Sequence, residues 1–181
     1  MHKGASLGLR ELVYTALASA LIAVSALITV PLPSAVAITL QTFGVYFALF
    51  FLGGRLGCIA VTLYIAIGAV GLPVFSGFSG GVGRLLDSTG GYIFGMIFAV
   101  IVWWLLDRFI PESKFKILLT SAVSLAVIYA TGSVWYALVY LGSAEHIVYA
   151  LTVGVIPFVI PDALKIWIAY IASKRLKSVK K

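Results

Sequence analysis

Long apolar runs separated by short polar breaks extend along the whole chain. Six such runs can be drawn, at residues 12–30, 41–54, 56–71, 90–106, 117–141 and 147–173. A helix that crosses a membrane needs roughly 20 apolar residues in succession. The pattern therefore predicts an all-α membrane protein with six transmembrane helices, of which the second and third are short for full spans.

The composition supports this fold class and leaves little room for anything else. Of the 181 residues, 62% are hydrophobic and 10% are charged, whereas soluble domains contain roughly 25% charged residues. We expect residues 1–181 to form a single integral-membrane domain. The first run is too long for the apolar part of a signal peptide and ends at Pro31-Leu32-Pro33 without a clean cleavage site, which favours a retained first helix.

The positively charged residues are distributed unevenly between the two predicted sides of the membrane. The net charge is +7, which in a soluble protein could indicate a nucleic-acid partner, but here the basic residues flank the apolar runs and no such partner is predicted. When successive loops are assigned to alternate sides, 11 of the 13 Lys and Arg fall on one side and Arg84 alone on the other, while Lys165 lies inside the last run. Positive loops face the cytoplasm, so both termini are predicted to be cytoplasmic in a multi-pass protein of the cytoplasmic membrane. The 11 residues are Lys3, Arg10, Arg55, Arg108, Lys114, Lys116, Lys174, Arg175, Lys177, Lys180 and Lys181.

A glycine-rich polar segment, residues 71–92, interrupts the apolar pattern. Irregular backbone at membrane depth must be buried in protein or line a water-filled cavity, so we expect a ligand site here. Arg84 and Asp87 either neutralise each other at the surface, or Arg84 anchors a ligand carboxylate with its planar fork. Tyr92 and Trp135 are either aromatic walls of the site or residues of the membrane-interface belt.

Asp162 and Lys165 form the second charged pair in an apolar region. A spacing of three residues places them on one face of a helix. Pro157 and Pro161 predict that the regular part of the last helix begins near Pro161, with Asp162 in its first turn, and that residues 147–160 form a separate, broken or interfacial piece. A deep ion pair is costly to desolvate and stabilises a fold only weakly, which favours substrate contact over a purely structural role.

Ala16 and Ala20 form a small-xxx-small pair on the first helix. Such pairs let helices approach closely, either within the bundle or against a separate membrane subunit. The chain contains no nucleotide-binding loop, no zinc-protease motif and no arguable catalytic triad, and its single cysteine, Cys58, excludes a cysteine-based zinc site. No catalytic or metal site and no bound cofactor is predicted, and any ATP must be used by partner subunits.

Several of these residues together resemble the BioY family, the biotin-specific S components of energy-coupling factor transporters. The resemblance extends in order over nearly the whole chain, and Asp87-Ser88 departs from it, since a small residue and a proline are expected there. Gln41, Thr42 and Phe75 thereby join the candidate substrate-binding residues. The resemblance rests on Gln41-Thr42, Gly71-Leu72-Pro73-Val74-Phe75, Gly80-Gly81, Thr89-Gly90-Gly91-Tyr92 and Pro161-Asp162-x-x-Lys165.

The resemblance implies a six-helix protein that binds biotin from outside and associates with a transmembrane coupling (T) subunit and two cytoplasmic ATPase (A) subunits. Members of this family are thought to topple in the membrane to release substrate. The Ala16 and Ala20 pair matches the motif with which such S components meet the coupling subunit, and the loop at residues 31–41 would be the lid.

Biotin joins an apolar bicycle and stem to a ureido group and a carboxylate, so its pocket needs apolar walls with a few polar groups. Our hypothesis is that Asp162 accepts ureido N–H bonds, Lys165 donates to the ureido oxygen and Arg84 meets the carboxylate. The alternative exchanges the roles of Lys165 and Arg84. Three other functions stay open at this point: an S component for riboflavin or thiamine, an intramembrane enzyme that uses Asp162 and Lys165, and a scaffold that transports nothing.

Overall fold

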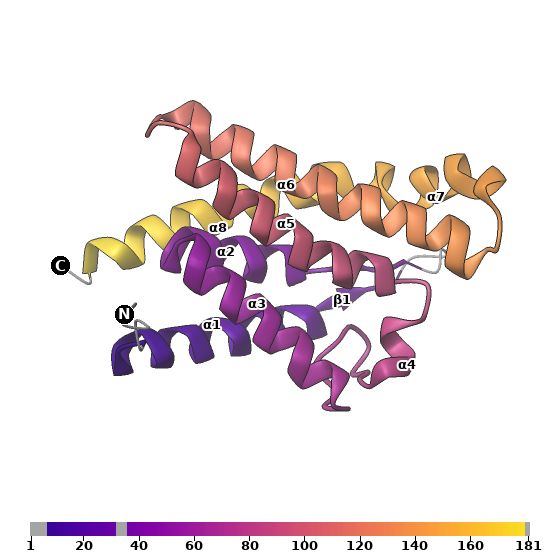
Figure 1. Ribbon diagram of the computed structural model, residues 1–181, viewed down its shortest axis with the longest axis horizontal. Coiled ribbons are helices and arrows are strands. Elements are labelled where there is room, and N and C mark those ends of the chain that lie inside the picture. Colours follow the sequence, from indigo (N-terminus) through magenta and orange to yellow (C-terminus); the bar gives the residue numbers. More distant parts are fainter. Residues whose placement is uncertain (1–6, 32–35, 180–181) are drawn as a thin grey trace, which may run out of the picture.

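A computed structural model describes residues 7–31 and 36–179, and it is mostly helical (Figure 1). Most of the chain lies in six longer helices, α1 (Leu9–Leu27), α2 (Gln41–Leu52), α3 (Gly54–Ala69), α5 (Gly90–Phe109), α6 (Lys114–Trp135) and α8 (Val159–Val179). The shorter elements are α4 (Val82–Leu85), α7 (Ile147–Gly154), a π-helical turn (Tyr136–Tyr140), 3₁₀ turns at Ala144–His146 and Ile156–Phe158, and the strands β1 (Thr29–Val30) and β2 (Ile38–Thr39).

Within the described residues, four helical segments are long and apolar enough to cross a membrane. They are Leu9–Leu27, Gly90–Phe109, Phe115–Tyr140 and Ala144–Ser178. The 12 residues of α2 and 16 of α3 extend over about 18 and 24 Å, less than the hydrocarbon thickness of about 30 Å. A mostly helical protein with several candidate membrane-spanning segments is thus confirmed, while the six membrane crossings, with those of α2 and α3 among them, stay a prediction.

The last apolar run is broken where the prolines predicted it. Helix α7 ends at Gly154, a 3₁₀ turn contains Pro157, and α8 begins at Val159 with Asp162 in its first turn. Proline has no N–H to donate to the preceding turn and so cannot continue a helix without a break. This break gives Asp162 a defined place at the start of a new helix.

Helix α2 lies at the centre of the bundle, where its residues from Val45 to Phe50 are all buried. Buried polar groups on it are paired with other helices. The Tyr46 hydroxyl lies 2.8 Å from Ser124 Oγ and donates to the Ser121 carbonyl oxygen at 3.0 Å, both on α6. These contacts satisfy a hydroxyl that would be costly to bury alone and fix α2 against α6.

Helices α5 and α6 approach closely through glycines. A side chain on Gly91 would overlap the Trp135 side chain, and one on Gly95 would overlap the Thr131 hydroxyl. Gly91 and Gly95 form a glycine-xxx-glycine face, the spacing with which transmembrane helices pack tightly. The close packing places the start of α5, with Tyr92, beside the end of α6.

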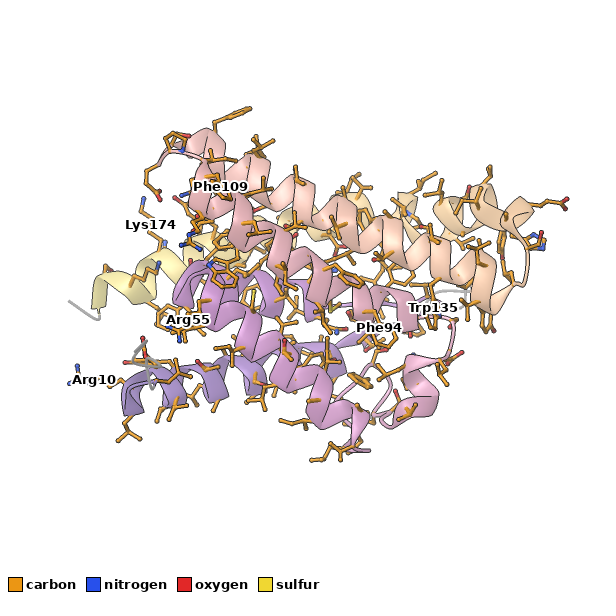
Figure 2. All side chains as sticks on the ribbon, in the orientation of Figure 1. Arg10, Arg55, Phe94, Phe109, Trp135 and Lys174 are labelled. Carbon is orange, nitrogen blue, oxygen red and sulfur yellow. The ribbon has the colours of Figure 1, made fainter. Side chains whose placement is uncertain are left out.

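The two ends of the bundle differ in composition. The start of α1 and the end of α8 lie at one end, where Arg10, Arg55 and Lys174 are found (Figures 1 and 2). The β1–β2 pair, α4 and α7 lie toward the other end (Figure 1). The strands pair Thr29 with Thr39, a small antiparallel contact that the apolar pattern did not predict. Of the expected lid, residues 31–41, positions 32–35 fall outside the described residues.

Candidate ligand-binding site

A cavity opens at the end of the bundle that contains the β1–β2 pair and the glycine-rich segment. It comprises about 640 Å³, including space continuous with the solvent. Nine of the 17 lining residues have apolar or aromatic side chains and seven have polar or charged ones. The lining residues are Val36, Ala37, Thr39, Gln41, Thr42, Phe75, Ser76, Thr89, Tyr92, Ile93, Met96, Ile128, Tyr129, Gly154, Phe158, Asp162 and Lys165.

A buried ionic cluster forms one wall of the cavity. Lys165 Nζ donates to Asp162 Oδ1 at 2.7 Å, and the Tyr129 hydroxyl donates to Asp162 Oδ2 at 2.9 Å. Asp162 is 4% exposed and Lys165 9%. Each carboxylate oxygen can accept a further hydrogen bond, and the ammonium group has three N–H donors. The cluster is therefore held in place by its own contacts and retains capacity for a ligand.

Gln41 is fixed at the first turn of α2. Its side-chain nitrogen donates to the Tyr64 hydroxyl at 3.0 Å and contacts Met96 Sδ at 3.2 Å. Its amide oxygen accepts no hydrogen bond from the described residues. Thr42 follows it and is also buried. The side-chain bonds orient Gln41 so that an acceptor remains available.

Thr89 immediately precedes α5, a position at which a threonine hydroxyl usually caps the helix. Here the side chain makes no cap hydrogen bond. Its hydroxyl is buried and has no partner among the described residues, and the same holds for the Tyr92 hydroxyl. Both residues line the cavity. Buried polar groups are nearly always hydrogen-bonded in folded proteins, so the Thr89 and Tyr92 hydroxyls are candidates for contact with a ligand.

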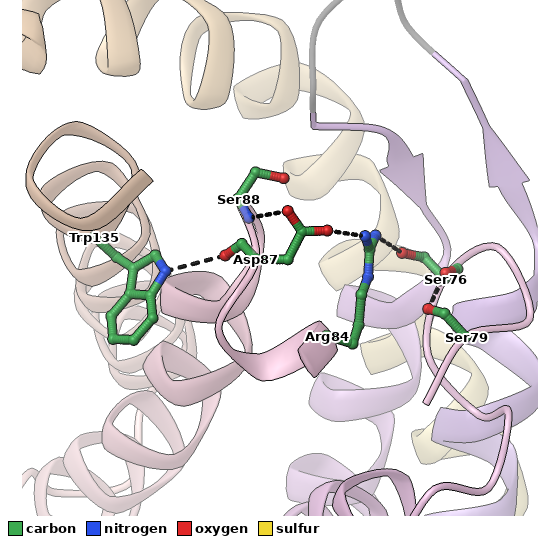
Figure 3. Close-up of polar contacts among 6 residues, drawn as sticks. All are labelled: Ser76, Ser79, Arg84, Asp87, Ser88 and Trp135. Atoms are coloured by element: carbon green, nitrogen blue, oxygen red, sulfur yellow. Dashed lines mark hydrogen bonds and ion pairs between the residues drawn. The ribbon is translucent and has the colours of Figure 1, made fainter. Parts of the chain in front are cut away.

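The glycine-rich segment is ordered by its own contacts. Arg84 Nη1 lies 2.7 Å from Asp87 Oδ2, and Arg84 Nη2 donates to Ser76 Oγ at 3.3 Å (Figure 3). Asp87 Oδ1 accepts from the Ser88 N–H at 2.7 Å. Ser76 lines the cavity, whereas Arg84 does not. In this structure the guanidinium is thus one side chain removed from the cavity and paired with the neighbouring carboxylate.

Trp135 also lies outside the cavity lining. Its indole N–H donates to the Asp87 carbonyl oxygen at 3.0 Å (Figure 3), and its ring packs against Phe94 with centroids 5.6 Å apart. The indole therefore holds the end of the glycine-rich segment against α6. The indole does not line the cavity in this structure, and a role of Trp135 as an aromatic wall of the site stays a prediction.

The structure brings six of the eight sequence-predicted substrate-binding residues to one cavity. They are Gln41, Thr42, Phe75, Tyr92, Asp162 and Lys165. Sequence reasoning missed Tyr129, because its partner Asp162 is 33 positions away and nothing local marks the pairing. It also missed the free hydroxyl of Thr89, although a threonine before Gly90-Gly91 at a helix start could have indicated one.

Ala16 and Ala20 line a separate apolar groove of about 840 Å³ between α1 and α3. Both alanines are exposed, so they do not pack within the bundle. The side chains that α1 buries lie on another face and include Thr15, Ala18 and Ile22. The small-residue pair is therefore available to a partner in the membrane.

Comparison with known proteins identifies a family and related sequences that match nearly the whole chain. The BioY family model matches residues 1–181. The biotin transporter BioY of Thermotoga maritima is 39% identical over 172 residues, which cover 94% of this chain and 98% of that protein. The probable biotin transporter BioY of Pyrococcus horikoshii is 38% identical over 168 residues, which cover 93% and 96% of the two chains.

A solved structure has the same fold. The S-component for biotin from an ECF-type ABC transporter superposes with a TM-score of 0.82 and 23% identity, over 96% of this chain and 95% of that one. The fold is thus common to both, and the family is established by the match over the full length of the sequence. This chain belongs to the BioY family.

Proposed function

We propose that this chain captures biotin and takes it up across the cytoplasmic membrane as the substrate-binding S component of an ECF-type ABC transporter. The observation on which the proposal rests is the cavity that combines apolar walls, a buried Asp162 and Lys165 pair and two unpartnered hydroxyls. The family, the names of the relatives and the fold of the solved S component support biotin over riboflavin or thiamine, and uptake over catalysis.

The proposed topology has six membrane-spanning helices and both termini in the cytoplasm. It requires α2 and α3 to cross the membrane despite their length, which local thinning of the bilayer would allow. The position of Arg10, Arg55 and Lys174 at one end of the bundle (Figure 2) supports this arrangement, because basic residues favour the cytoplasmic side. The cavity then faces the outside, where biotin is captured.

In the proposed complex, the ureido group of biotin meets the ionic cluster. Asp162 accepts from the ureido N–H groups with its free lone pairs, and Lys165 donates to the ureido oxygen. Tyr129 holds the carboxylate in position through its 2.9 Å hydrogen bond. The apolar bicycle and stem then contact the aromatic and aliphatic walls, among them Phe75 and Phe158.

The biotin carboxylate is assigned to Arg84. Its Nε atom is buried without a partner among the described residues, so the guanidinium has donor capacity left over. Arg84 already contacts Ser76 in the cavity wall, and a ligand carboxylate would compete with Asp87 for it. In the alternative orientation, Lys165 contacts the carboxylate and Arg84 contacts the ureido oxygen. The two ends of biotin then exchange places in the cavity.

The proposed partners are a transmembrane T subunit and two ATPase subunits, which hold and hydrolyse the ATP. We assign the groove at Ala16 and Ala20 to the T subunit, since small residues allow a partner helix to approach closely. The groove is lined almost entirely by apolar side chains. Docking here would leave the cavity mouth free.

Replacement of Asp162 by Asn should abolish tight biotin binding. The parent protein, purified without added vitamin, should retain a mass equal to biotin in native mass spectrometry. Asp162→Asn leaves Lys165 buried without its counter-charge, which lowers the stability of the fold by about 3 to 5 kcal/mol. It also removes the charged acceptor of the ureido N–H bonds, worth about 1.5 to 3 kcal/mol or one to two decades in affinity. Asp107→Asn is the matched control, because Asp107 forms a 3.0 Å ion pair with Lys116 and neither residue lines the cavity. Equal biotin affinity in Asp162→Asn and the parent would exclude Asp162 from the site.

Replacement of Thr89 by Val removes a hydroxyl but keeps the side-chain shape. Without ligand the unfolding midpoint in detergent should not fall, since the Thr89 hydroxyl has no partner among the described residues. Biotin affinity should fall about two- to tenfold, the value of one neutral hydrogen bond. Titration calorimetry and thermal unfolding of the same sample measure both. A stability loss with unchanged affinity would show that the hydroxyl serves the fold.

Arg84 can be tested with a ligand that lacks the charge. The parent should bind biotin more tightly than biotin amide, by about ten- to a hundredfold for a charge-assisted contact. Arg84→Ala should bind both ligands with nearly equal affinity. Lys165→Met serves as the comparison. If Lys165→Met loses the preference for biotin over biotin amide and Arg84→Ala keeps it, the ligand lies in the reversed orientation.

Replacement of Ala20 by Leu should block the α1 groove without changing the cavity. The T subunit should no longer copurify with Ala20→Leu, while biotin affinity stays within about twofold of the parent, since surface substitutions away from a site change energies by about 0.5 kcal/mol or less. Ala126→Leu, on the exposed face of α6, controls for added bulk. Normal copurification with Ala20→Leu would place the T subunit elsewhere.

A further inference from the structure

A second large groove lies between α6 and α8, with Phe50 of α2 in its lining. It comprises about 1120 Å³ and faces away from the β1–β2 end. On α6 its lining extends from Ile117 to Leu125, and on α8 from Ala163 to Lys174. Nearly all of the lining side chains are apolar, so in a membrane the groove must be filled by something apolar.

The groove is about as long as one leaflet of the bilayer. At 1.5 Å per residue, its walls on α6 and α8 extend over about 12 and 16 Å, and half of the hydrocarbon core measures about 15 Å. Its lining ends at Leu125 on α6 and begins at Ala163 on α8. A transmembrane helix of a partner would extend beyond these residues, whereas an acyl chain of one leaflet matches the length of the groove.

The open end of the groove is positively charged. Lys174 lines it and is exposed, with no ion-pair partner among the described residues. Arg175 and Lys177 lie on the same helical turns, and α8 contains no acidic residue beyond Asp162. Lys116, at the facing end of α6, is already paired with Asp107 and Glu112. Lys174 is thus the cation available to an anionic headgroup.

We propose that the α6–α8 groove binds one anionic phospholipid, with an acyl chain between the helices and the phosphate on Lys174. The lipid belongs to the leaflet at the end of the molecule where α8 ends. Its chain packs against Ala163 and Ile166, on the helix whose neighbouring residues Asp162 and Lys165 line the cavity. The proposal depends on α6 and α8 spanning the membrane and is independent of the identity of the transported ligand.

The test uses the delipidated full chain in detergent. Phosphatidylglycerol or phosphatidylcholine with the same acyl chains is added, and native mass spectrometry measures which lipid is retained. The parent should retain one phosphatidylglycerol in preference to phosphatidylcholine. Lys174→Gln should reduce this preference about fivefold, and Lys177→Gln, which removes a cation outside the groove, should not. Ala122→Phe should fill the groove and abolish retention, and Val123→Phe, at an exposed position of α6 outside the groove lining, should not.

Thermal unfolding in detergent checks that each variant is folded, and the exposed Lys174→Gln keeps the test valid if Ala122→Phe is unstable. Equal retention of the two lipids by the parent would overturn the proposal. So would undiminished phosphatidylglycerol on a folded Ala122→Phe, or an equal loss of preference in Lys177→Gln and Lys174→Gln. A dimer of the chain that only Ala122→Phe dissociates would assign the groove to a second copy instead.

Discussion

The buried ion pair of Asp162 and Lys165 is the contact around which the cavity is built. Two charges are expensive to remove from water, and their attraction offsets this cost only when geometry and further hydrogen bonds are good. Here Lys165 Nζ lies 2.7 Å from Asp162 Oδ1, and the Tyr129 hydroxyl donates a further hydrogen bond to Asp162 Oδ2. Without the helix break after Gly154, Asp162 would lie in the middle of a helix rather than in the first turn of α8, where the helix dipole favours a carboxylate.

The glycine-rich segment solves a different problem, irregular backbone at the edge of an apolar bundle. Several of its backbone polar groups are satisfied within the protein, as is expected where water is scarce. The Gly81 N–H donates to the Gly68 carbonyl oxygen at 2.7 Å, and the N–H groups of Gly90 and the Trp135 indole both donate to the Asp87 carbonyl oxygen. Phe75 is 1% exposed. The segment is therefore a folded wall of the cavity.

Much of this could be predicted from the sequence, for identifiable reasons. Apolar runs and prolines act locally, so the helices and the break near Pro161 were correct to within a few residues. The same holds for Asp162 and Lys165, whose spacing alone places them together. Roles that depend on packing between distant segments could not be predicted. Trp135 holds a carbonyl oxygen 48 positions away, and the β1–β2 pair arises where α1 stops at Leu27, earlier than the apolar run itself.

The role of Arg84 also could not be decided from the sequence. Its spacing to Asp87 left a surface pair and a ligand anchor equally open, and the structure contains the pair. The 2.7 Å contact and the bond to Ser76 do not decide between them, because the guanidinium has five N–H donors and contacts the cavity wall through Ser76. A guanidinium with donors to spare can contact a ligand carboxylate and keep its contact with Asp87.

The cavity and the α1–α3 groove share a wall that is one side chain thick. Tyr64 lines the groove, and its hydroxyl accepts a hydrogen bond from Gln41 in the cavity. Val74 lines the groove and the next residue, Phe75, lines the cavity, with its ring 5.5 Å from that of Tyr64. A T subunit docked in this groove, as proposed, would lie against Tyr64 and Val74, the neighbours of Gln41 and Phe75. If docking shifts this wall, the coupling free energy is reciprocal, and ligand in the cavity alters the affinity for the T subunit by the same factor.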